Sequence, residues 1–128
     1  MDGIRNIVMK RVCLAALMTS FVVAIPLSIT AVDEPLNQTI DYLIDYVAKS
    51  DATFIRNGQT HTPAEAVNHI KAKYEHFKSE IKTPEDFIRL SASKSLVTGQ
   101  PYLVRTKDGK EMQLSTWLTD ALKKHRGQ

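Results

Sequence analysis

The chain is poor in cysteine: Cys13 is the only thiol in its 128 residues. A single thiol cannot form a disulfide within the chain, and it cannot supply a zinc site of several cysteines. Cys13 also lies in the apolar stretch near the start, so residues 32–128 contain no cysteine at all. Whatever domain these residues form must therefore be held together by packing.

The chain also lacks an apolar run of the about 20 residues that a helix needs to cross a bilayer. Its longest apolar stretch covers residues 12–25, follows three basic residues and is ended by Pro26. A basic start, a short apolar stretch and a small residue at the cleavage point are the parts of a secretory signal peptide. We therefore expect residues 1–31 to be a signal peptide that is cleaved after Ala31. An uncleaved N-terminal anchor is the alternative.

An excess of one charge is missing as well. Without the leader, residues 32–128 carry 14 Lys and Arg against 13 Asp and Glu. This balance argues against a nucleic-acid partner and against binding to anionic lipid, because both require a concentrated basic surface. The remaining 97 residues are enough for one small domain. We expect this cysteine-free domain to work in the periplasm or to be secreted, with no stable membrane span after signal removal.

Apolar spacing and turn signals predict a mostly helical α+β domain with about four helices and one or two short β-hairpins. Helices are expected over residues 35–50, 63–78, 84–93 and 115–126; strands are expected over 53–56, 59–61, 102–106 and 110–114. Two helix starts, Thr62-Pro63-Ala64-Glu65 and Thr83-Pro84-Glu85-Asp86, are almost identical. Each offers a capping Thr, a Pro at the first helical position and an acid that can bond back to the cap. Ser115 is expected to cap the last helix.

Two polar, turn-rich segments, residues 56–61 and 94–102, flank the expected helices, and such loops often carry binding sites. Between them, Glu65, His69 and Lys73 follow at four-residue spacing, which places them on one face of a helix. The candidate ligand- or partner-binding residues are Arg56, Asn57, His61, Glu65, His69, Lys73, Lys94, Ser95 and Tyr102. The alternative is ordinary turn chemistry beside an exposed charged helix face.

The sequence patterns for catalysis or metal binding are weaker than those for a binding site. Glu65 and His69, with His61 nearby, could be metal ligands, but no H-E-x-x-H pattern or cysteine completes a site, so no metal or cofactor is expected. Residues 91–94 match the S-x-x-K spacing of penicillin-recognising enzymes without the partner motifs. A small hydrolase using Ser93 or Ser95 with His69 or Lys94 stays open as an alternative function.

Several runs in order carry a family resemblance: Phe54-Ile55-Arg56-Asn57-Gly58, His61-Thr62-Pro63-Ala64-Glu65-Ala66, Thr83-Pro84-Glu85-Asp86-Phe87-Ile88 and Thr98-Gly99-Gln100-Pro101-Tyr102. Over roughly residues 52–122 the chain resembles the uncharacterised domain-of-unknown-function family 5329 (YfeK-like) of short exported proteobacterial proteins. The resemblance implies a bacterial, periplasmic, single-domain protein and brings no established activity. The family often has Tyr in place of His61 and two adjacent serines in place of Ser95-Leu96. These departures weaken a catalytic role for His61 or for a serine nucleophile.

Taken together, the sequence favours a non-enzymatic exported binding or accessory module. Its partner would be an unidentified envelope protein or a small polar ligand. A purely structural envelope protein that forms a permanent oligomer is a third possibility.

Overall fold

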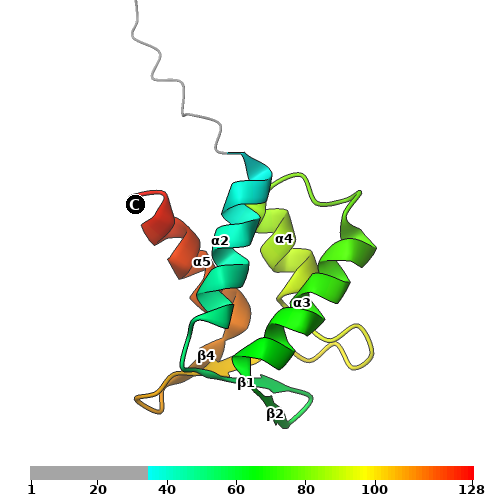
Figure 1. Ribbon diagram of the computed structural model, residues 1–128. Coiled ribbons are helices and arrows are strands. Elements are labelled where there is room, and N and C mark those ends of the chain that lie inside the picture. The colour runs from blue at the N-terminus through cyan, green and yellow to red at the C-terminus, as the bar shows by residue number, and fades with distance from the viewer. Residues whose placement is uncertain (1–34) are drawn as a thin grey trace, which may run out of the picture. The chain divides into compact units, whose positions relative to one another are not determined.

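The computed structural model describes residues 35–128, which form helices above a small sheet in the view of Figure 1. In chain order the elements are α2 (Leu36–Ala48), β1 (Thr53–Arg56), β2 (Gln59–His61), α3 (Pro63–Phe77), α4 (Pro84–Ser91), β3 (Leu103–Arg105), β4 (Glu111–Gln113) and α5 (Leu114–His125). The predicted signal peptide, residues 1–31, lies outside the described residues. No helix of residues 35–128 is long and apolar enough to cross a membrane.

The four strands form one antiparallel sheet in the order β2-β1-β3-β4. Each of the two predicted hairpins is present, and β1 and β3 join them into a single sheet. The turn of the first hairpin has positive φ at both Asn57 (51°) and Gly58 (77°). This is the conformation that Asn-Gly favours in two-residue hairpin turns. The predicted mostly helical α+β fold is therefore confirmed.

Pairing between β1 and β3 decides which residues meet at one end of the sheet. Ile55 on β1 pairs with Leu103 on β3 in antiparallel register. The next position along each segment is then Arg56 on β1 and Tyr102 just ahead of β3. This register places two of the candidate binding residues beside each other.

The core lies where the helices meet one another and the sheet. Helix α2 packs on α3, α4 and α5, while α3 contacts β1 and α5 contacts β3 and β4. The largest fully buried apolar side chains are Phe87, Ile40, Leu43, Leu118, Leu122, Val47 and Val104. Trp117 is half-buried and packs against this core, with its ring centroid 4.6 Å from that of Tyr46.

The two predicted caps differ in detail. Thr62 forms the complete capping box with Glu65: its hydroxyl accepts from the Glu65 backbone N–H at 3.2 Å, and its own N–H donates to Glu65 Oε2 at 2.8 Å. Thr83 accepts from the Asp86 N–H, but the Asp86 carboxylate accepts from the Lys82 N–H instead of from Thr83. Both Thr residues nevertheless fix the first turn of their helices.

Other predicted boundaries were wrong. Helix α5 begins at Leu114 and has no side-chain cap, so Ser115 is not its cap. The Leu114 N–H donates to the Tyr102 carbonyl at 2.9 Å, and this bond ties the helix start directly to the sheet. Helix α4 ends at Ser91, two residues before the predicted end, and Ser93 Oγ donates to the Ile88 carbonyl there. That local bond competes with continuing the helix.

Candidate ligand-binding site

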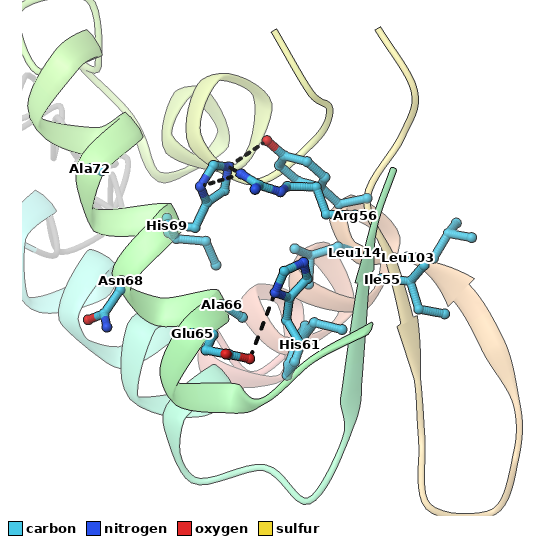
Figure 2. Close-up of a pocket in the computed structure, with 13 residues that line it drawn as sticks. Ile55, Arg56, His61, Glu65, Ala66, Asn68, His69, Ala72, Leu103 and Leu114 are labelled. Carbon is cyan, nitrogen blue, oxygen red and sulfur yellow. Dashed lines mark hydrogen bonds and ion pairs between the residues drawn. The ribbon is translucent and has the colours of Figure 1, made fainter. Parts of the chain in front are cut away.

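A cavity of about 400 Å³ opens beside α3, β1 and the start of β3. Its lining residues are Phe54, Ile55, Arg56, His61, Glu65, Ala66, Asn68, His69, Ile70, Ala72, Tyr102, Leu103 and Leu114. Most of these are apolar, and the polar ones other than Asn68 gather in two groups. Figure 2 shows Arg56 with His69 in one group and His61 with Glu65 in the other.

The first polar group joins β1 to α3. Arg56 Nη1 lies 2.8 Å from Nδ1 and 2.9 Å from Nε2 of the His69 ring. His69 is half-buried on α3, one turn after Glu65. The other ring contact of His69 is to the Tyr102 hydroxyl, 2.9 Å from Nε2. The imidazole therefore bridges the guanidinium of Arg56 and the phenol of Tyr102.

Lys73 lies behind Tyr102 and is buried, with 7% of its surface exposed. Its Nζ donates to the Lys94 carbonyl at 2.6 Å and to the Tyr102 hydroxyl at 3.4 Å, and it lies 4.9 Å from the centre of the Tyr102 ring. All of these partners are neutral. The interpretation of Lys73 as part of an exposed charged face was wrong, because the loop after α4 covers it.

The contacts assign a protonation state to His69. Arg56 can only donate, so its contact requires a ring nitrogen that accepts, and an imidazolium has none. The ring is therefore neutral. Burial, then the charges of Arg56 and Lys73, lowers the pKa of His69 in agreement with this state. Burial also lowers the pKa of Lys73 and raises the pKa of Tyr102.

The second polar group lies at the start of α3. His61 Nδ1 is 3.7 Å from Glu65 Oε2, so Glu65 pairs with His61 and not with His69 as its helical spacing suggested. The backbone N–H of Thr62 lowers the pKa of Glu65 by bonding to its charged form. His61 Nε2 is inaccessible to solvent and has no hydrogen-bond partner among residues 35–128. One ring nitrogen in the lining of the cavity is therefore unsatisfied.

Asn57 and Ser95 serve a different purpose from the cavity residues. Asn57 Nδ2 donates to Ser95 Oγ at 3.4 Å, and Asn57 Oδ1 accepts from the Thr98 hydroxyl at 2.6 Å. Ser95 Oγ also accepts from the Val97 and Thr98 backbone N–H groups. These bonds fasten the loop of residues 94–101 to the β1–β2 turn.

The structure thus brings five of the nine candidate residues to one cavity: Arg56, His61, Glu65, His69 and Tyr102. Lys73 joins them through Tyr102, and Lys94 takes part through its carbonyl while its own side chain is exposed. Phe54, Ile70 and Leu114 form the apolar floor of the cavity and were not among the predicted site residues. Their only signal was apolar periodicity, which marks core and pocket positions alike. Asn68 gave no signal.

The serine-based alternative finds no geometric support in the described part of the chain. Neither Ser93 Oγ nor Ser95 Oγ forms a hydrogen bond with His69 or with the Lys94 side chain there. Residues 35–128 also contain no group of three or more His, Cys, Asp or Glu side chains placed to hold a metal ion.

Comparison with known proteins places the chain among uncharacterised relatives. The profile of a family of unknown function, DUF5329, matches residues 34–126. A curated relative, the uncharacterized protein YfeK of Salmonella typhimurium strain LT2, is 46% identical over 54 residues. That match covers 42% of this chain and 45% of the relative, so the chain spans less than half of the relative's length. No solved structure matches the chain significantly. Because the profile covers most of the sequence, the chain belongs to the DUF5329 family.

Proposed function

We propose that this protein is an exported binding module whose ligand is a small polar molecule held in the cavity beside α3 and β1. The observation that supports the proposal most directly is the convergence of Arg56, His69, His61 and Glu65 on one cavity of about 400 Å³. Small-molecule sites have volumes of about 300–1,000 Å³ and combine apolar walls with a few fixed polar groups. A cavity of this kind suits a small molecule better than a flat protein surface.

The polar groups of the cavity are held in fixed positions, as ligand recognition requires. Arg56 is oriented by its contact to the His69 ring, and His69 is oriented in turn by Tyr102. Such a chain of hydrogen bonds reduces the conformational entropy that a ligand would otherwise have to overcome. It therefore favours binding without a large rearrangement.

Binding is tested by NMR of the uniformly ¹⁵N-labelled protein against a set of small neutral, cationic and anionic molecules. We expect at least one class to shift the backbone amides of residues around the cavity. Ala72 is an exposed lining residue, so Ala72→Phe should obstruct the cavity and weaken binding at least tenfold. Ala64→Phe, on the same helix but outside the cavity, is the matched control. Absence of shifts with every class, or equal binding by the two variants, would rule out this site.

Export is tested on the full chain expressed in a bacterial host. The basic start and short apolar stretch of residues 12–25 support secretion, and the lack of cysteine in residues 32–128 allows folding without disulfide formation. We expect the protein in the periplasmic fraction, with Val32 as its first residue. A cytosolic protein that still starts at Met1 would contradict the proposal.

A further inference from the structure

The positive charges of the candidate site have no negative partner within the described protein. Among residues 35–128, neither Arg56 nor Lys73 forms an ion pair with a carboxylate, whereas Arg89, Arg105 and Arg126 each do. Arg56 bonds to a neutral imidazole, and Lys73 bonds to a carbonyl and a phenol. Partly buried cations without a counter-ion favour the binding of an anion beside them.

Arg56 also has the free donors that an anion would use. Only its Nη1 has a partner within residues 35–128, so Nε and Nη2 remain available. A guanidinium edge with two parallel N–H groups matches the two oxygens of a carboxylate. The contact with His69 holds the guanidinium at the cavity lining, where Figure 2 shows the two residues together. Arg56 is therefore arranged to receive a planar anionic group.

The rest of the lining limits the charge of such a ligand. Arg56 is the only Lys or Arg among the described lining residues, because Lys73 lies behind Tyr102. Glu65 also lines the cavity and disfavours a ligand with two negative charges. Away from the polar groups the lining is apolar and includes Phe54, Ile70 and Leu114. An apolar environment penalises a dianion such as phosphate more than a single carboxylate with an attached hydrocarbon.

We propose that the ligand is a small monocarboxylate with an apolar body, a proposal that rests on the binding function of the cavity proposed above. The carboxylate accepts hydrogen bonds from the Arg56 guanidinium. The apolar body lies against Phe54, Ile70 and Leu114.

The experiment compares four probes on the wild-type protein by NMR titration at pH 7: hexanoate, hexan-1-ol, hexylamine and inorganic phosphate. The first three share a six-carbon chain and differ in the charge of the head group. We expect hexanoate to bind at least tenfold more tightly than hexan-1-ol, since charge-assisted hydrogen bonds are about twice as strong as neutral ones. Hexylamine and phosphate should bind more weakly than hexanoate.

Variants then locate the carboxylate. Arg56→Gln should weaken hexanoate binding about tenfold and leave hexan-1-ol binding unchanged. Arg105→Gln removes the same charge from an exposed position on the same sheet, and it should leave hexanoate binding unchanged. The comparison of probes on the wild-type protein does not depend on the folding of either variant.

Failure of this proposal is distinguishable from failure of the cavity as a site. Equal affinity for hexanoate and hexan-1-ol, with shifts at the cavity, would overturn the anionic ligand and leave the binding function standing. Tighter binding of phosphate or of hexylamine than of hexanoate would also overturn the monocarboxylate ligand. So would hexanoate binding that Arg56→Gln does not weaken. No binding of hexanoate would also overturn the anionic ligand. The titrations with neutral, cationic and anionic molecules described above would then decide whether the cavity binds any ligand.

Discussion

Replacing Phe87 with alanine is expected to lower the free energy of unfolding by about 3–5 kcal/mol. Phe87 is 1% exposed and heads the fully buried side chains by volume. Its helix, α4, contacts α2, α3 and α5, and its ring packs edge-on against Tyr74 with centroids 5.6 Å apart. Alanine would lose this apolar burial and leave a cavity among three helices that cannot all close over it. Urea unfolding followed by circular dichroism measures the change.

Phe77→Ala is the matched control for this prediction, because it removes the same ring from a partly exposed position on α3. We expect it to cost less than about 2 kcal/mol, since much of that ring is not buried. A domain of this size has a total stability of about 5–10 kcal/mol. Phe87→Ala should therefore unfold at markedly lower urea concentration than Phe77→Ala. Equal urea midpoints for the two variants would contradict the prediction that Phe87 contributes more to stability than Phe77.

The helices could be predicted well because their signals are local. The capping Thr and the following Pro fix the start of α3 and α4 through bonds within a single turn, so the sequence identified both starts correctly. The start of α5, which was predicted wrongly, depends on a distant residue. Helix α5 begins where the Leu114 N–H meets the Tyr102 carbonyl, twelve residues earlier in the chain. No pattern around Ser115 could reveal that bond.

Several residues of the site could be predicted from the sequence, but their arrangement in space could not. Helical spacing correctly indicated that Glu65, His69 and Lys73 share one side of α3, but it could not say which of them would be buried. That depends on the loop of residues 94–101, whose carbonyl at Lys94 accepts from Lys73. The pairing of β1 with β3, which places Arg56 beside Tyr102, joins segments almost fifty residues apart. Such pairing is set by the packing of the whole domain and leaves no short motif.

Replacing Tyr102 is the second change expected to have a large effect, because this residue belongs to both the core and the site. The sequence predicted Tyr102 to be a binding residue at the end of a polar loop, but Tyr102 is 5% exposed and lies within the core cluster. Tyr102→Ala should therefore lower the free energy of unfolding by about 3–5 kcal/mol, as for other large buried side chains.

Tyr102→Phe isolates the hydroxyl. It keeps the ring that packs in the core and under Lys73 Nζ, and it removes the oxygen that hydrogen-bonds to His69 Nε2 and accepts from Lys73. We expect a cost of about 1–3 kcal/mol, because His69 and Lys73 would each lose a hydrogen-bond partner in a partly or fully buried position. Tyr42→Phe is the control: its hydroxyl has no hydrogen-bond partner among residues 35–128, so its stability should change by less than about 0.5 kcal/mol.

The same pair of Tyr102 variants shows how far the site depends on the core. If the phenol only orients His69, Tyr102→Phe should keep the wild-type amide spectrum away from Arg56, His69 and Lys73, and Tyr102→Ala should change it widely. Unfolding measurements and spectra together then separate the packing of the ring from the hydrogen bonds of the hydroxyl. A Tyr102→Phe variant as unstable as Tyr102→Ala would contradict this division. In that case the hydrogen bonds of the hydroxyl, and not the packing of the ring, would hold the start of β3 against α3.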